Sequence, residues 1–192
     1  MGQSNSETSA KADCVHCDAL LQENEHLKKQ LREMEDRAHH DVLTGLANRR
    51  FFLDGLKVRI SRCQRYGDKT ALLFLDVDGL KQVNDRHGHQ AGDLLLTRLA
   101  AILADNIRVS DMVARIGGDE FAVLLDNIGP AEVDQKVAFL QNLIQSDDIE
   151  FGDQHLNLSA AIGHCFVGPE DTVDDLMSRA DAAMYREKRK AG

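Results

Sequence analysis

The chain has 192 residues, a hydrophobic share of 43% and a formal net charge of −9. This length suits one domain of ordinary size plus an extension, and the hydrophobic share is sufficient for a buried core. The acidic balance excludes general binding to nucleic-acid polymers or anionic membranes, which requires basic patches. No apolar run approaches the length of a membrane span, and no signal-peptide segment is present. We therefore expect a cytoplasmic protein.

The N-terminal segment is predicted to form a dimer. Residues 1–12 are polar and are expected to be disordered. Residues 13–38 carry a heptad seam, because side chains suited to a helix interface recur at alternating spacings of three and four: Cys17, Leu20, Asn24, Leu27, Leu31, Met34 and Ala38. A single asparagine at an a position favours a parallel two-stranded coil, in which Glu23 faces Lys28 of the second helix. The alternative is one amphipathic helix that packs on its own domain.

Cys14 and Cys17 stand at the head of this seam with the Cys-x-x-Cys spacing of zinc ligands. A disulfide is less expected in a cytoplasmic protein. One chain offers too few ligands for a closed structural site, but a parallel dimer brings two cysteine pairs together. We hypothesise a structural Zn²⁺ site, or a redox-sensitive thiol pair, that regulates activity through the coil. The alternative is that these cysteines have no regulatory role.

Residues 39–192 read as one globular domain. The expected elements are helices over residues 49–66, 92–107 and 131–145, a final helix from residue 173, strands ending near residue 78 and spanning residues 156–166, and a hairpin over residues 112–125. Strands and helices in this order predict an α+β, two-layer domain with a central, mostly antiparallel sheet.

Two acidic clusters stand at the ends of predicted strands. The run over residues 70–75 is almost continuously apolar, which is typical of a central strand, and it ends at Asp76 and Asp78. Asp119 and Glu120 follow Gly117-Gly118 inside the predicted hairpin, where a tight turn needs positive φ at both glycines. If the hairpin pairs beside the central strand, Asp76 and Glu120 can share a Mg²⁺ ion. The alternative for the hairpin is a solvated acidic turn.

Several ordered motifs carry a resemblance to the GGDEF family of diguanylate cyclases. They are residues 41–49 (DVLTGLANR), 76–85 (DVDGLKQVND), 88–93 (GHQAGD), 117–121 (GGDEF) and 180–185 (ADAAMY). The resemblance spans about residues 41–188. It implies a fold similar to the palm of polymerases and nucleotide cyclases. It also implies condensation of two GTP molecules into cyclic di-GMP, with one GTP bound by each protomer of a homodimer.

The resemblance also implies roles for individual residues. Asp76, Glu120 and the backbone carbonyl of Val77 match ligands of Mg²⁺ or Mn²⁺. Asp119 matches an acidic residue that helps to deprotonate the 3′-hydroxyl or contacts a second metal ion. Asn84 and Asp93 match the pair that reads guanine, and their amide and carboxylate suit its edge. Without the family context, Asn84 would be read as a turn or helix cap and Asp93 as a helix N-cap.

Phosphate contacts are implied for Gly117, Gly118 and Lys188. The family usually has an arginine four positions beyond this lysine, where this chain has Gly192. A shortened chain, or compensation by Arg189 or Lys190, would account for the departure. The alternative for the basic run of Arg186, Lys188, Arg189 and Lys190 is an ordinary solvated helix end.

Arg108 and Asp111 match the family's RxxD site, at which cyclic di-GMP inhibits its own synthesis. The alternative is a local salt bridge at the end of a helix. For the whole chain we therefore predict a diguanylate cyclase with product inhibition. The second reading is a catalytically silent GGDEF module that binds GTP or cyclic di-GMP as a receptor.

Overall fold

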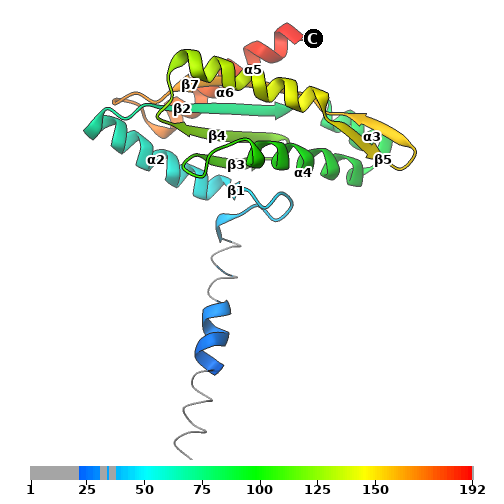
Figure 1. Ribbon diagram of the computed structural model, residues 1–192, viewed down its shortest axis with the longest axis horizontal. Coiled ribbons are helices and arrows are strands. Elements are labelled where there is room, and N and C mark those ends of the chain that lie inside the picture. The colour runs from blue at the N-terminus through cyan, green and yellow to red at the C-terminus, as the bar shows by residue number, and fades with distance from the viewer. Residues whose placement is uncertain (1–21, 31–33, 35–37, 192) are drawn as a thin grey trace, which may run out of the picture. The chain divides into compact units, whose positions relative to one another are not determined.

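The computed structural model describes residues 22–30, 34 and 38–191 (Figure 1). The chain divides into two units, residues 1–38 and residues 39–192. In the first unit, residues 22–30 are helical, and Leu27 and Met34 of the predicted seam are exposed. Residues 1–12, Cys14 and Cys17 lie outside the described residues, so the predictions of disorder and of a zinc or redox site remain predictions.

The second unit is built on one five-stranded sheet with the strand order β1-β3-β4-β2-β7. The strands are β1 (Ala47–Asn48), β3 (Met112–Gly117), β4 (Glu120–Asp126), β2 (Thr70–Val77) and β7 (Ala160–Phe166). Only β1 and β3 pair in parallel among these strands, whereas the other three pairs are antiparallel. The predicted α+β class with a mostly antiparallel central sheet is therefore confirmed.

Helices cover both faces of this sheet, so the domain has three layers and the prediction of two layers is wrong (Figure 1). Helices α2 (Arg49–Tyr66) and α6 (Val173–Ala191) share a core cluster with Leu72 and Phe74 of β2, whereas α4 (His89–Asp105) and α5 (Pro130–Ser146) share one with Leu73 and Leu75. This alternation follows from the period of two in a strand. It confirms that β2 is a central strand covered on both faces. No helix in the described part of the chain is long and apolar enough to cross a membrane.

The structure departs from the expected elements in several places. Helix α4 begins at His89 rather than residue 92, because Gly88 (φ 84°) ends the short helix α3 (Leu80–His87) and lets the next helix start at once. The single strand expected over residues 156–166 is two strands, β6 (Gln154–Asn157) and β7, which belong to different sheets. Strand β6 pairs with β5 (Asp148–Phe151), which was not predicted.

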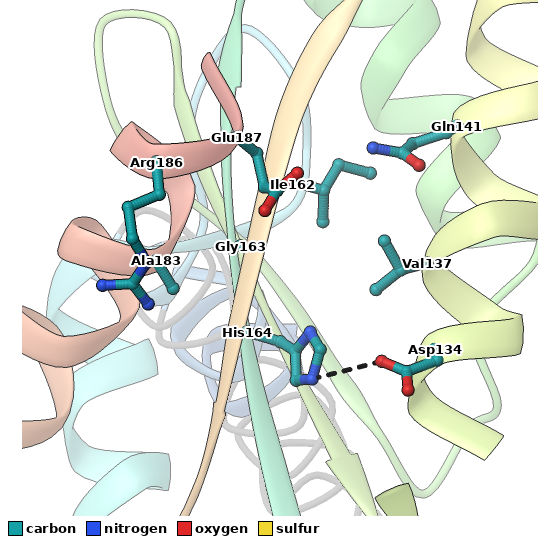
Figure 2. Close-up of a pocket in the computed structure, with 9 residues that line it drawn as sticks. All are labelled: Asp134, Val137, Gln141, Ile162, Gly163, His164, Ala183, Arg186 and Glu187. Carbon is teal, nitrogen blue, oxygen red and sulfur yellow. Dashed lines mark ion pairs between the residues drawn. The ribbon is translucent and has the colours of Figure 1, made fainter. Parts of the chain in front are cut away.

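Helix α6 lies unusually close to β7. A Cβ atom on Gly163 would lie 2.0 Å from the backbone nitrogen of Met184, so only glycine permits this approach. The adjoining groove between α5 and α6 has a volume of about 300 Å³, and His164 Nε2 lies 3.5 Å from Asp134 Oδ1 in it. Figure 2 shows these two side chains facing each other. The close packing fixes α6 over the sheet and brings its last turns to the end of β2.

Candidate active site

Two carboxylates meet at the end of the central sheet. Strands β2 and β4 pair from Thr70 opposite Asp126 to Asp76 opposite Glu120. Side chains alternate along each strand, and the even-numbered neighbours of both residues pack in the α2/α6 cluster. Asp76 and Glu120 therefore lie side by side on the face that α2 and α6 cover. This is the juxtaposition that the sequence predicted if the hairpin paired beside the central strand.

Negative charge accumulates around this pair. Burial raises the pKa of Asp76, and the charges of Asp119 and Asp78 add to the shift. Burial likewise raises the pKa of Glu120, with further contributions from Asp119, Asp76 and Asp181. The carboxylates thus repel one another in the ionised form, and a cation placed between them would relieve that repulsion.

Lys188 is the cation that the structure brings to this cluster. Its Nζ donates to Asp76 Oδ1 and forms an ion pair, and its side chain stays 40% exposed. The hydrogen bond to Asp76 raises the pKa of Lys188. Arg49, at the start of α2, also lies close enough to lower the pKa of Glu120. Lys188 therefore reaches the site from α6, at the edge of the carboxylate cluster.

The glycine pair forms a hairpin, as predicted, but the turn is displaced by one residue. Strand β3 runs through Gly117, and only Gly118 and Asp119 separate it from β4. Gly118 has a positive φ of 22°, whereas Gly117 does not, so the prediction for Gly117 is wrong. The reason is a register shift between Arg115 and Gly117, which adds a residue to β3. We define the Gly118–Asp119 pair as the GG turn.

The described residues hold no cluster of three or more His, Cys, Asp or Glu side chains arranged for a metal ion. The predicted ligands are two carboxylates and one backbone carbonyl, at Asp76, Glu120 and Val77. Such a partial set suits Mg²⁺, which usually keeps several waters and binds substrate phosphates as well. After burial, neighbouring carboxylate charges contribute to the raised pKa values of Asp76 and Glu120, and a cation would offset that repulsion. The donor set therefore fits this metal.

Asn84 carries an unsatisfied polar atom beside the site. Its Oδ1 is buried, and no residue in the described part of the chain donates a hydrogen bond to it. The amide lies against the backbone of α4, since a Cβ on Gly92 would lie 2.1 Å from that oxygen. Asp93, the next residue of α4, is exposed. Because such orphaned acceptors are rare, this oxygen suggests a ligand that supplies the missing donor.

Neither Asn84 nor Asp93 is a helix cap, so the alternative interpretations of these two residues as caps are wrong. Asn84 lies inside α3, whose N-cap is Gly79, and Asp93 lies inside α4, whose N-cap is Gly88. Helix α3 follows directly from the strand end that carries Asp76, and it packs against α4. The structure thus brings Asn84 and Asp93 together on neighbouring helices.

Arg108 and Asp111 lie in a different place, on the loop between α4 and β3. They line a cleft of about 430 Å³ with residues that include Lys136 and Phe139 of α5. Asp111 Oδ1 accepts from the backbone nitrogen of Asp126 at 3.0 Å. Arg108 is exposed, and in the described residues Asp111 is bonded to the backbone of Asp126 rather than paired with Arg108. The salt-bridge alternative is therefore wrong.

The sequence did not predict one pair beside the GG turn. Arg115 of β3 donates to the carbonyl oxygen of Gly118 and also to the carboxylate of Asp41. Asp41 opens the first motif of the globular unit, but 74 residues separate it from Arg115. The local signals of a turn here are Thr44, which bonds back to Asp41, and Gly45 with its positive φ of 70°.

Comparison with known proteins places this chain in a family. The sequence model described as "Diguanylate cyclase, GGDEF domain" matches residues 38–192. The chain is 39% identical over 163 residues to the bifunctional diguanylate cyclase/cyclic di-GMP phosphodiesterase MucR of Pseudomonas aeruginosa, covering 84% of this chain and 24% of MucR. It is 37% identical over 182 residues to diguanylate cyclase TpbB of the same organism, covering 90% and 41%. The chain thus spans less than half of each relative.

Solved structures agree with the sequence relatives. The coiled coil and GGDEF domain of DgcB from Caulobacter crescentus, in complex with c-di-GMP, superimposes with a TM-score of 0.85 at 28% identity and covers 95% of both chains. Diguanylate cyclase SiaD of Pseudomonas aeruginosa, in complex with its activator SiaC, gives a TM-score of 0.78 at 29% identity, covering 97% of this chain and 73% of SiaD. From motifs, fold and relatives together, the chain belongs to the GGDEF family of diguanylate cyclases.

Proposed function

We propose that this chain condenses two GTP molecules into cyclic di-GMP and two pyrophosphates, with one GTP bound by each protomer of a homodimer. The observation that carries the proposal is the pairing of Asp76 with Glu120 at the end of the central sheet. Asn84 adds specificity, since its buried oxygen lacks a donor. These features supply a cation site and a base-reading group on consecutive elements of one chain.

Asp76, Glu120 and the Val77 carbonyl would hold Mg²⁺ or Mn²⁺. When bound, the metal would lower the charge on the triphosphate and favour attack on the α-phosphorus. Asp119 lies in the GG turn, and its charge reaches both Asp76 and Glu120. A carboxylate there is placed to accept the proton of a 3′-hydroxyl, or to contact a second cation. Such general-base assistance contributes roughly 10²–10⁴-fold to a rate.

Phosphates are oriented by groups around the GG turn. Gly117 leaves open the space beside Glu120, because a Cβ there would lie 3.6 Å from Glu120 Oε2. Lys188 is half-exposed and can extend its ammonium group toward a phosphate oxygen. Its present partner Asp76 is also a metal ligand in this proposal. Lys188 and the cation therefore compete for the same carboxylate, which would favour transfer of the lysine to phosphate in the loaded site.

Guanine is read by Asn84 and Asp93. The Asn84 Oδ1 atom needs a donor, and the N1 and N2 hydrogens of guanine are donors. Adenine has no hydrogen at N1, so it would leave one of these acceptors unpaired. A site built from such groups discriminates strongly against an analogue that lacks the matching hydrogen. We therefore propose GTP rather than ATP as the substrate.

The decisive experiment incubates the full chain with GTP and Mg²⁺ and separates the nucleotides by chromatography. We expect cyclic di-GMP and pyrophosphate from the wild type and no turnover from Glu120→Gln, which retains the shape of the side chain but loses the charge. The control Glu170→Gln changes an exposed acid outside the site and should remain active. Binding of GTP without product would favour the silent receptor, and activity of Glu120→Gln would contradict the metal assignment.

We further propose that the Arg108–Asp111 cleft binds the product. An exposed guanidinium can grip a phosphate with two hydrogen bonds or stack on a base. Arg108→Ala should relieve inhibition by added cyclic di-GMP while initial rates without product stay unchanged. Arg108 is a cleaner test than Asp111, because Asp111 also holds the backbone of Asp126. Undiminished inhibition in Arg108→Ala would remove Arg108 from the product site.

A further inference from the structure

Arg115, which is not one of the proposed catalytic or metal-binding residues, fixes the backbone of the GG turn. Arg115 Nε and Nη2 both donate to the carbonyl oxygen of Gly118, at 3.1 and 2.7 Å. Arg115 Nη1 donates to Asp41 Oδ1 at 3.1 Å, and only 15% of the arginine side chain is exposed. All three nitrogens of the guanidinium therefore donate within the protein. A planar fork of this kind fixes its acceptors in position as well as in distance.

The next carbonyl of the turn is held from the other side. The backbone nitrogen of Val77 donates to Asp119 O at 3.1 Å. Val77 directly follows Asp76 at the end of β2. The turn has only two residues, so both of its carbonyls are fixed, one by Arg115 and one by the strand that carries a metal carboxylate. Releasing the first leaves only the second of these two carbonyl bonds, beside the pairing of Gly117 with Glu120 that flanks the turn.

Asp41, the carboxylate that pairs with Arg115, is itself fixed within a second turn. Asp41 Oδ1 also accepts from the backbone nitrogen and the hydroxyl of Thr44, at 2.9 and 2.7 Å. Gly45 N donates to Asp41 O at 2.9 Å, which closes this turn. The segment then continues into β1, where Asn48 lies opposite Arg115 of β3. Asp41 is thus an anchored carboxylate rather than a mobile surface group.

We infer that Arg115 is a positioning residue of the cyclase, which sets the GG turn against β2 by linking the Gly118 carbonyl to the Asp41 carboxylate. This inference rests on the proposed function, because the turn is the one that carries Asp119 and precedes Glu120. Arg115 acts through the backbone and takes no part in the chemistry. The link also joins the proposed active site to the first turn of the globular unit.

The test compares Arg115→Ala with Arg179→Ala in the full chain. Arg179 is a matched control, since it too joins a backbone carbonyl, Phe166 O, to a carboxylate, Asp171. It lies at the opposite end of the sheet, because Phe166 pairs with Ala71 near the start of β2. We expect kcat to fall about 10–100-fold in Arg115→Ala, as misplacement of groups by about 1 Å can do, with KM for GTP nearly unchanged. Arg179→Ala should leave kcat unchanged.

Hydrogen exchange gives a readout that does not need turnover. The Val77 amide proton is bonded to the turn, so its exchange should become at least tenfold faster in Arg115→Ala and stay unchanged in Arg179→Ala. Asp41→Asn keeps an acceptor for Thr44 but loses the charge that pairs with Arg115, and it should show the same changes to a smaller degree. The double variant should have a kcat no lower than that of Arg115→Ala, because both substitutions act through the Gly118 carbonyl.

Each outcome decides the inference. Unchanged kcat in Arg115→Ala together with unchanged Val77 exchange would overturn it. Equal effects in Arg179→Ala would overturn it as well, since they would indicate a general loss of stability. If Arg115→Ala does not fold, as judged by circular dichroism, Asp41→Asn decides by the same two measurements. If the wild type forms no cyclic di-GMP, the proposed function fails, and Val77 exchange alone decides the positioning role.

Discussion

At the scale of single residues, Asn84 is expected to contribute to the binding of GTP and not to the stability of the free protein. Replacing Asn84 with Ala removes the acceptor proposed for guanine, and we expect KM for GTP to rise about 10–100-fold, the equivalent of one buried hydrogen bond. The free protein should not lose stability, because the buried oxygen has no partner in the described structure and alanine is the better helix former by roughly 0.5 kcal/mol.

This prediction is checked by steady-state kinetics and by thermal unfolding without nucleotide. Gln82→Ala is the matched control, since it changes an exposed amide of the same helix and should alter neither quantity. A marked fall of Tm in Asn84→Ala, with unchanged KM, would show that Asn84 serves the fold rather than the ligand.

Asp41 provides a pH-dependent test at the same scale. Burial alone would raise the pKa of Asp41, but the hydrogen bonds from Thr44 and the charge of Arg115 outweigh it and lower the pKa below its usual 3.8. A lowered pKa in the folded state stabilises the protein above the unfolded pKa, and this contribution is lost as pH falls through the folded pKa. At pH 7 we expect Asp41→Asn to be less stable than the wild type by about 1 kcal/mol.

Urea unfolding between pH 7 and pH 3 would measure this contribution. The difference in free energy of unfolding between the wild type and Asp41→Asn should be constant at neutral pH and should shrink below about pH 3.8. A difference that stays the same over the whole range would mean that the ionised carboxylate gives no net stabilisation.

At the scale of secondary-structure elements, substitutions at two glycines distinguish an effect on packing from an effect on catalysis. Gly163→Ala would drive a Cβ into the backbone of α6 at 2.0 Å, and we expect a loss of about 1–3 kcal/mol in the free energy of unfolding. Gly117→Ala meets only an ordinary contact at 3.6 Å and should keep its stability. Its new methyl group lies beside Glu120, however, so its turnover should fall.

Chemical denaturation and the GTP assay together check this contrast. Gly163→Ala should also weaken the contact between Lys188 and Asp76, because α6 must move away from β7. If both variants lost stability equally, the close approach of α6 to β7 would not be the cause.

Much of the site could be predicted because its signals are local. A continuous apolar run ending at Asp76 and a glycine pair followed by Asp119 and Glu120 can be read within a few residues. Strand β1 has two residues and α3 buries none of its side chains, so neither shows a clear period. The bond between Arg115 and Asp41 joins residues 74 positions apart, which no periodicity indicates.

At the scale of the whole molecule, the proposed reaction needs two chains. Leu27 and Met34 of the predicted seam are 56% and 68% exposed in the single chain. Lys28 pairs with Glu25 of its own helix at 3.2 Å, so the pairing of Lys28 with Glu23 of a second helix remains a prediction. Leu27→Asp should shift the protein from dimer to monomer and lower cyclase activity by at least about tenfold, since a buried charge at a d position is costly.

Sedimentation and activity should be measured over the same range of protein concentration. His26→Asp, which adds the same charge at a predicted outward position of the helix, is the control and should remain dimeric. GTP binding per chain should be equal in both variants. A monomeric variant with full activity would contradict the dimeric mechanism.

The register between β2 and β4 has one more consequence. Seven consecutive residue pairs set Asp76 opposite Glu120, and a slip by one residue would turn the core side chains of β2 toward the wrong faces. The two carboxylates therefore persist for as long as the hydrophobic core does. A regulatory signal therefore does not need to bring these two carboxylates together within one folded chain. We expect it to act instead on how often, and in which orientation, two finished half-sites face each other.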